Sequence, residues 1–226
     1  MRLRLAELPI YVAHYSKLVE RRARLQKDLS ELGLRATWLT EHDSEDISDD
    51  VLQRCYPYND DVWRLKTEFY TSEPPRPIKR SEASLAFKHL EFYRRLRDAA
   101  HACALVLEDD VLFDRHFCDH FDRYFTSVPD DFDFIFIGSG CNLRVPNPSS
   151  TVHFYPKSTP STKCTDSYLI TRRAAERLLA VMPPLTLPID FELNYQLHAL
   201  QMRVYWLEPP LVVQGSQSGL YRSAIQ

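Results

Sequence analysis

The chain has 226 residues and a formal net charge of -3, with 44% hydrophobic and 26% charged residues. The mildly acidic balance excludes a bulk attraction to nucleic acid or to acidic membranes. Because no Gly- or Ser-rich linker and no internal repeat divides the sequence, we expect one domain over residues 1–226.

The first forty residues predict a strand, a helix and a second strand. Residues 10–13 are apolar and favour a short strand, and residues 36–39 favour the next. Between them, Ser16 is the expected N-cap of a helix to Leu32, and Gly33 is the expected left-handed residue after it. This order predicts a right-handed crossover and a parallel pair of strands.

The rest of the chain continues with strands, helices and two long loops. Strands are expected over residues 103–107, 131–138, 204–207 and 211–213. Helices are expected over residues 81–100, 113–125, 172–182 with Thr171 as N-cap, and 188–200. Residues 40–79 are acidic and then rich in aromatic residues and Pro, so we expect an excursion over the ligand face with short helices. Residues 142–163, rich in Pro, Ser and Thr, are expected to form a second long loop.

The run from Leu105 to Asp110 reads Leu-Val-Leu-Glu-Asp-Asp and predicts a buried strand that ends in adjacent carboxylates. Carboxylates this close repel one another unless a cation balances them, and Mg²⁺ or Mn²⁺ prefers such oxygen ligands. In an extended chain, Glu108 and Asp110 point one way and Asp109 the other. We therefore expect Glu108 and Asp110 to bind the metal. The alternative is a cluster that caps the following helix.

A second acidic pair, Asp190 and Glu192, follows late in the chain. Either residue is a candidate general base, and Asp190 is also a candidate helix cap. His89 lies on an apolar helix face, where a histidine is more often a core residue than a ligand. The sequence contains neither a P-loop nor a Gly-x-Gly-x-x-Gly motif, so a bound diphosphate would depend on metal and basic side chains.

Several segments, taken together and in order, resemble glycosyltransferase family 25, which includes bacterial lipooligosaccharide and collagen hydroxylysine galactosyltransferases. The matching segments are residues 10–12 with Ser16 and 20–22, 81–84 through His89, 107–110, 165–171 with 174–175, 188–190, and 209–214 with Ser218. One block departs from the family pattern. Ser81 and Ser84 replace glycines, Leu85 replaces a cysteine and Lys88 replaces a serine.

The resemblance implies an α/β fold of the GT-A type, with a Rossmann-like mixed sheet flanked by helices. It also implies an inverting transferase that uses Mn²⁺ or Mg²⁺ and a UDP-sugar, with UDP-galactose as the expected donor. The acceptor would be a hydroxyl of a glycan or of hydroxylysine. Glu108 and Asp110, a DXD-like motif, would hold the metal against the diphosphate, and Asp190 or Glu192 would act as the base.

The resemblance also implies a set of donor-binding residues. At the end of the first strand, Val12, Ala13 and Tyr15 would cover the uridine, and Arg21 or Arg22 would reach the diphosphate. The full set is Val12, Ala13, Tyr15, Arg21, Glu82, His89 and Asp109. Gln214 or Ser216 is a candidate third metal ligand.

Two other classes of protein fit parts of the pattern. One is a catalytically inactive protein that binds carbohydrate or nucleotide sugar on the same fold, and the other is a metal-dependent phosphohydrolase. The sequence has no long apolar leader or membrane span, so we expect a cytoplasmic protein, or a lumenal one if the chain is a fragment. Five cysteines without Cys-x-x-Cys spacing are expected to be reduced thiols.

Overall fold

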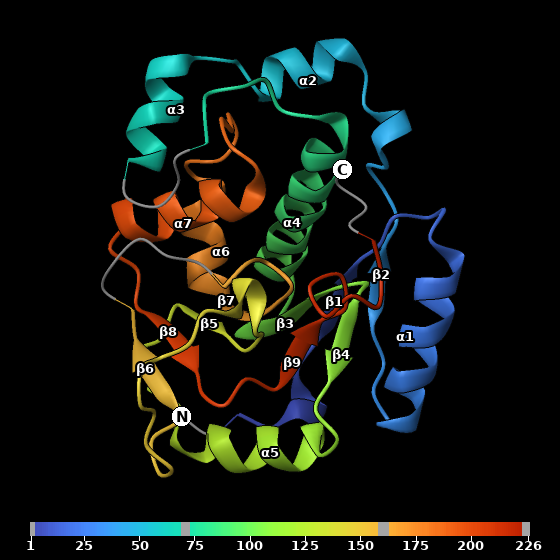
Figure 1. Ribbon diagram of the computed structural model, residues 1–226, viewed down its shortest axis with the longest axis vertical. Coiled ribbons are helices and arrows are strands. Elements are labelled where there is room, and N and C mark those ends of the chain that lie inside the picture. Colours follow the sequence, from blue (N-terminus) through green and yellow to red (C-terminus); the bar gives the residue numbers. More distant parts are fainter. Residues whose placement is uncertain (1–2, 69–72, 158–162, 223–226) are drawn as a thin grey trace.

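A computed structural model describes residues 3–68, 73–157 and 163–222. Within them, seven strands form a sheet in the order β2-β1-β3-β7-β5-β8-β6 (Figure 1). These strands are β1 (Ile10–Ala13), β2 (Thr37–Leu39), β3 (Cys103–Glu108), β5 (Phe134–Phe136), β6 (Phe154–Pro156), β7 (Ser167–Thr171) and β8 (Val204–Leu207). A separate pair consists of β4 (Val111–Phe113) and β9 (Val212–Gln214).

The strand directions make the sheet mixed, which confirms the predicted fold. β1 is parallel to both β2 and β3, whereas β7 runs antiparallel to β3 and β5. β8 is parallel to β5, and β6 is antiparallel to β8. Ala13 lies opposite Glu108 in the β1–β3 register, so both strands end side by side at the same edge. The carboxyl ends of parallel strands are where open α/β sheets bind ligands.

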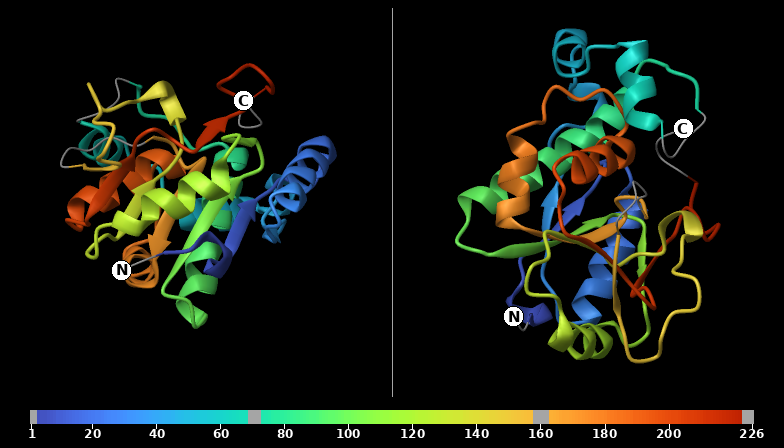
Figure 2. Two further views of the ribbon diagram at one scale, coloured as in Figure 1. Left: turned by 90° about the horizontal axis from the view of Figure 1, so that it is seen from below. Right: turned by 90° about the vertical axis from the view of Figure 1, so that its left-hand side faces the viewer.

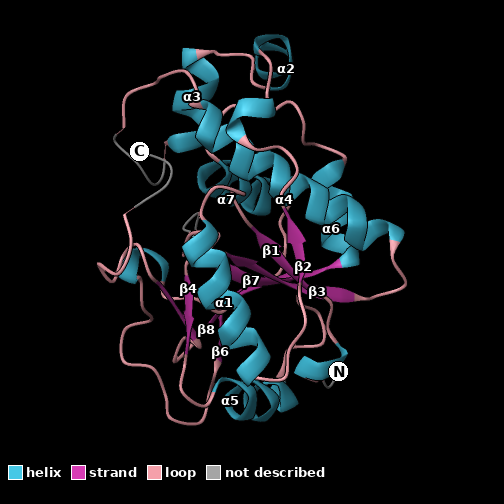
Figure 3. Cartoon of the chain, turned by 90° about the vertical axis from the view of Figure 1, so that its right-hand side faces the viewer, coloured by secondary structure: helices cyan, strands magenta, loops and turns pink. Residues whose placement is uncertain are grey.

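Helices cover both faces of the sheet. Figures 2 and 3 show α4, α6 and α7 on one side of the strands and α5 on the other, where Figure 3 also shows α1. The helices are α1 (Val19–Glu31), α2 (Asp49–Cys55), α3 (Asp60–Thr67), α4 (Arg80–Asp98), α5 (Phe117–Tyr124), α6 (Arg172–Leu179) and α7 (Ile189–Ala199). No described helix is both long and apolar enough to cross a membrane.

Side chains of β3 alternate between the two faces of the sheet and pack into two hydrophobic cores. Ala104 and Val106 belong to the core that contains α4, α6 and α7, whereas Leu105 and Leu107 belong to the core that contains α1 and α5. All four side chains are fully buried. Because β3 is covered on both faces, the acidic residues at its end project from a rigid element.

Two predicted helix starts are wrong. The first helix begins at Val19, not after Ser16, whose backbone N–H instead donates to the Asp43 carboxylate at 3.1 Å. The helix predicted from residue 113 begins at Phe117, because Phe113 pairs with Val212 in the β4–β9 ladder. A local repeat of phenylalanines carries no information about a partner strand 99 residues later. The predicted Gly33 is left-handed, with φ 68°.

Three strands are absent from the sequence-based prediction, and one of them is β4, whose last residue Phe113 was assigned to the following helix. β6 lies inside the predicted loop 142–163, and β7 was not predicted as a strand. β7 lies between β3 and β5 with its first four residues buried, so it has no polar face to produce an alternating pattern. Short helices α2 and α3 lie in the predicted excursion 40–79. The helix over Arg172–Leu179 ends three residues earlier than predicted, and Thr171 caps it as expected.

Candidate active site at the ends of β1 and β3

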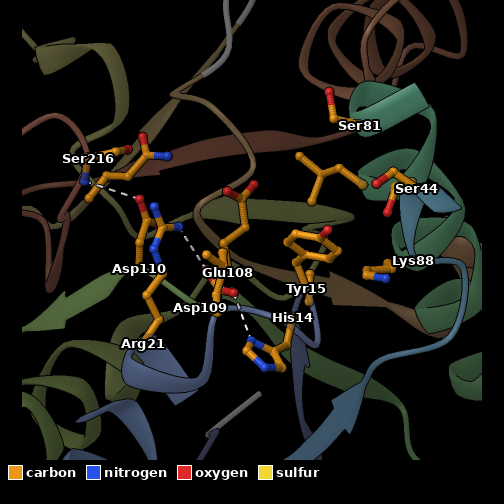
Figure 4. A pocket seen from close by; sticks show the side chains of 15 residues that line it. His14, Tyr15, Arg21, Ser44, Ser81, Lys88, Glu108, Asp109, Asp110 and Ser216 are labelled. Carbon is orange, nitrogen blue, oxygen red and sulfur yellow. Dashed lines mark hydrogen bonds and ion pairs between the residues drawn. The ribbon is translucent and has the colours of Figure 1, made fainter. Parts of the chain in front are cut away.

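A pocket of about 100 Å³ lies at the edge where β1 and β3 end. Its walls are the turn after β1, the acidic run after β3, the first turns of α4 and the segment after β9 (Figure 4). The side chains used below that line it are Ala13, His14, Tyr15, Arg21, Leu85, Lys88, Glu108, Asp109, Asp110, Gln214 and Ser216. The pocket is therefore built from segments that are far apart in the sequence.

The acidic run divides its carboxylates between two sides. Asp109 accepts from Arg21 Nη1 at 3.0 Å and lies 2.8 Å from His14 Nδ1, so it is held by β1 and α1 (Figure 4). Asp110 is directed to the opposite segment, where its Oδ2 accepts from the Ser216 backbone N–H at 3.1 Å. Glu108 contacts neither His14 nor Arg21 in the described part of the chain. This division agrees with the alternation expected for an extended run.

A hydroxyl links Glu108 to the late acidic residue Asp190. Thr165 Oγ1 lies 2.7 Å from Glu108 Oε1 and 2.5 Å from Asp190 Oδ1. One hydroxyl carries one proton, so both contacts are hydrogen bonds only when one carboxyl is itself protonated. Burial and the neighbouring Asp110 raise the pKa of Glu108 to about 8, and burial and Glu108 raise the pKa of Asp190 to about 6. At least one carboxyl of the cluster is therefore protonated, and a bound cation would reduce the repulsion between the carboxylates.

Asp166 adds a further carboxyl to this cluster. It is fully buried, and burial together with Glu108 raises its pKa well above the ordinary value. Among the described residues, its carboxyl group accepts a hydrogen bond only from the Ser167 hydroxyl, at 3.1 Å, while its backbone carbonyl accepts from the Glu108 N–H at 2.8 Å. Gly138 makes room for it, because a Cβ at position 138 would lie 2.0 Å from Asp166 Oδ2. The absence of a side chain at Gly138 therefore allows the Asp166 carboxyl to lie buried beside the acidic run.

Unpartnered oxygens support a metal at this place. Asp110 Oδ1, Asp166 Oδ1 and Gln214 Oε1 are buried and accept no hydrogen bond from the described residues. Buried polar atoms without partners are costly, and carboxylate and amide oxygens are the ligands that Mg²⁺ and Mn²⁺ prefer. Among the described residues, no three or more His, Cys, Asp or Glu side chains form a ligand set.

His89 lies behind the acidic run, outside the lining of the pocket. Its Nδ1 is 2.6 Å from the Tyr168 hydroxyl, and its Nε2 is 3.9 Å from Glu108 Oε1. Burial lowers the pKa of His89 to about 4, so the ring is neutral at pH 7. His89 therefore lies in the core behind Glu108, and its Nε2 has no hydrogen-bond partner among the described residues.

The predicted donor-binding residues are only partly together. Ala13, Tyr15, Arg21 and Asp109 line the pocket. Val12 does not, because its side chain points to the other face of β1 and is fully buried in the core with α1 and α5. Arg22, the alternative to Arg21, lies over the Trp38 ring at 5.2 Å. Glu82 forms a bidentate pair with Arg76, at 2.6 and 2.8 Å, beside a neighbouring pocket.

The structure also separates the two candidate bases. Asp190 adjoins the acidic run through Thr165. Glu192 is completely buried elsewhere, bonded to Lys66 at 2.6 Å and to Gln196 at 2.8 Å. With its charge paired in the core, Glu192 has no route to a substrate.

Sequence reasoning missed two side chains in the pocket wall and one behind it. His14 directly follows the first strand, so its position at the carboxyl edge was available as a signal. Lys88 was noted only as a departure from the family pattern, but it reaches the pocket and donates to Asp43 and to the Glu41 carbonyl, both at 2.7 Å. Asp166 lies in the segment 165–171 that resembles the family, but it was not chosen as a site residue, because β7, which it precedes, was not predicted.

Comparison with known proteins gives one family and a fold. A family model described as glycosyltransferase family 25 (LPS biosynthesis protein) matches residues 7–193. The chain is similar in structure to a glycosyltransferase involved in the glycosylation of the major capsid of PBCV-1, with 10% identity and a TM-score of 0.50, covering 92% of this chain and 91% of that one. A197 from STIV is a weaker match, with 11% identity, a TM-score of 0.41, and coverage of 93% and 83%. No curated protein sequence matches.

Proposed function

The chain belongs to glycosyltransferase family 25, and we propose that it is an inverting, metal-dependent enzyme that transfers a hexose from a UDP-sugar to a hydroxyl acceptor. Galactose is the sugar that the family resemblance favours. The observation that carries the proposal is the set of clustered carboxyls and unpartnered oxygens at the end of β3. Such a cluster suits a cation and a diphosphate, not a neutral ligand.

Asp110 and Glu108 are the proposed metal-binding carboxylates. Asp110 has one oxygen fixed by the Ser216 N–H, and its Oδ1 accepts nothing from the described residues. A bound divalent cation supplies Lewis-acid stabilisation of the charge that develops on the departing diphosphate. Gln214, opposite Val111 in the β4–β9 pair, lines the same pocket and offers a neutral oxygen.

The donor would occupy the pocket between β1 and α4. Ala13 and Tyr15 offer a surface for the base, and two basic side chains, Arg21 and Lys88, line the same cavity. Asp109 is proposed to fix Arg21 and His14 in the pocket wall, not to hold the metal. Basic side chains in place of a glycine-rich cradle agree with a chain that has only 5 glycines.

Asp190 is the proposed general base. Thr165 holds its Oδ1 through both the backbone N–H, at 3.1 Å, and the hydroxyl. A carboxylate fixed in this way can take the proton of an acceptor hydroxyl as it attacks the sugar from the face opposite the leaving UDP. One base and one displacement produce inversion without a covalent intermediate.

The test is calorimetry of UDP binding followed by a donor screen. UDP with MnCl₂ should bind, EDTA should abolish binding, and Asp110→Ala should lose the metal-dependent part. Arg97→Gln, at the far end of α4, is a matched control variant on the surface. UDP-sugars should then release UDP slowly, by hydrolysis, even without an acceptor. UDP binding that ignores EDTA would contradict the metal site, and binding without release from any sugar donor would favour an inactive binding protein.

A further inference from the structure

A second pocket, of about 170 Å³, adjoins the first, and Leu85 on α4 lines both. Its other walls come from the segment before α4 and from the start of α7. Asp190 lines this second pocket, whereas Glu108 and Asp110 line the first. The two cavities thus meet at Leu85 and are linked through the Thr165 hydroxyl between Glu108 and Asp190.

We propose that this second pocket is the acceptor subsite and that it binds a sugar ring without negative charge. The inference rests on the proposed function, which places the donor in the first pocket and makes Asp190 the base. A hydroxyl bound in the second pocket would meet Asp190, which lines that pocket, whereas Glu108 and Asp110 line the first. A base and metal-binding carboxylates on separate cavities suit an inverting displacement.

The apolar walls of this second pocket, of about 170 Å³, favour a sugar ring. Leu85, Pro188 and the half-buried Phe191 form apolar surface, which suits the C–H faces of a pyranose. Small-ligand sites combine such surfaces with a few polar groups that fix orientation.

The charges of the pocket exclude an anionic acceptor. Its basic side chain, Arg76, is bonded twice to Glu82 and lies 4.0 Å from Glu73. With Asp190, the described lining carries three carboxyl groups and one guanidinium. A uronate or a phosphorylated sugar would meet like charge here. An ammonium group would match the charge but would lose hydration against Leu85, Pro188 and Phe191, so a neutral ring fits best.

The test measures binding directly, by saturation-transfer NMR with UDP and MgCl₂ present. The probes are para-nitrophenyl galactoside and glucoside, the matching glucuronide, and lysine methyl ester. The neutral glycosides should bind, and the glucuronide and the lysine ester should not. Phe191→Ala should weaken glycoside binding about tenfold, the equivalent of an aromatic contact worth about 1.4 kcal/mol. Leu65→Ala, which removes an exposed apolar side chain of α3, is the control.

A charge reversal provides an independent variant. Glu73 is half exposed, so Glu73→Lys should fold normally and should admit the glucuronide. Equal binding of glucuronide and neutral glycoside by the unmodified protein, preference for the lysine ester, or glycoside binding unchanged by Phe191→Ala would each overturn the inference. Measuring the UDP affinity of these variants distinguishes a failure of the proposed donor site from a failure of the proposed acceptor subsite. Loss of metal-dependent UDP binding in the unmodified protein contradicts the proposed function, whereas glycoside binding reports on this pocket alone.

Discussion

Asp109 and Arg21 form a buried ion pair 3.0 Å long, and this pair sets the middle carboxylate of the acidic run apart from its neighbours. The second oxygen of Asp109 lies against His14. Both partners come from the β1–α1 segment, so Asp109 ties that segment to the end of β3. Its neighbours Glu108 and Asp110 face the opposite side, toward Thr165 and Ser216.

Asp109→Ala should therefore destabilise the protein more than it weakens metal binding. It leaves Arg21 buried without its carboxylate, and breaking a buried pair in this way costs about 3 kcal/mol. We expect a lower free energy of unfolding in urea and a smaller loss of Mn²⁺-dependent UDP affinity than in Asp110→Ala. If Asp109→Ala instead abolished metal-dependent binding at unchanged stability, Asp109 would be a ligand.

Asp190→Asn and Glu192→Gln should have opposite effects. Asp190→Asn should keep donor binding and lower the transfer rate about 10²- to 10⁴-fold, the usual contribution of a general base. Glu192→Gln should keep kcat and reduce stability, because the change leaves the buried Lys66 without its charge partner. Transfer kinetics and thermal unfolding of both variants check this, and a low kcat for folded Glu192→Gln would reverse the assignment.

Cys141 and Cys164 should form a disulfide under mild oxidation. Their sulfur atoms lie 2.9 Å apart, Cys141 is exposed, and its hydrogen bond with Cys164 lowers the pKa of Cys141 to about 7. The Cys141 thiolate would attack glutathione disulfide and release one glutathione. Cys164 would then displace the second, so the protein loses two electrons and two protons.

The count of free thiols should fall from five to three and recover with dithiothreitol. Above pH 7 the thiolate of Cys141 predominates, so the reaction should slow as the pH falls below this value. Cys141→Ser should stop the intramolecular reaction. An unchanged thiol count in the unmodified protein after prolonged exposure would contradict the predicted pairing.

Gly138→Ala should disturb the site without touching the pocket lining. The new Cβ would lie 2.0 Å from Asp166 Oδ2, so the buried carboxyl must move. We expect weaker UDP–Mn²⁺ binding by calorimetry. Gly33→Ala is the control, because position 33 is left-handed and open, and the change there costs only stability, about 1 kcal/mol. If Gly138→Ala and Gly33→Ala bound UDP with equal affinity, Asp166 would have no role in the site.

Local patterns identified the elements that carry the acidic run. β1 and β3 are continuous apolar runs, α4 has helical apolar periodicity, and Glu108-Asp109-Asp110 follows a buried strand, so the sequence located one wall of the pocket correctly. The two residues before β7 that adjoin the acidic run, Thr165 and Asp166, escaped prediction, because β7 is defined by its neighbours in the sheet.

Asp190 and Glu192 show where sequence spacing stops being informative. Both lie in the first turn of the same predicted helix and carry a carboxyl group. Residues two positions apart on a helix differ by about 200° around its axis, so these two side chains face opposite ways. Only the packing of α7 against α3 and the β7 segment decides that Asp190 meets Thr165 and Glu192 meets Lys66.

Because Gly138 lies so close to Asp166, we expect these two short segments to evolve together. Similarly, a Cβ at Gly140 would lie 1.6 Å from the Lys163 carbonyl oxygen. A lineage that replaces either glycine must first rebuild residues 163–166, and one that shortens Asp166 no longer needs the gap. Related sequences should therefore carry Gly138-Ser139-Gly140 and Asp166 together or lack both. This paired signature could identify relatives too divergent for overall identity to reveal.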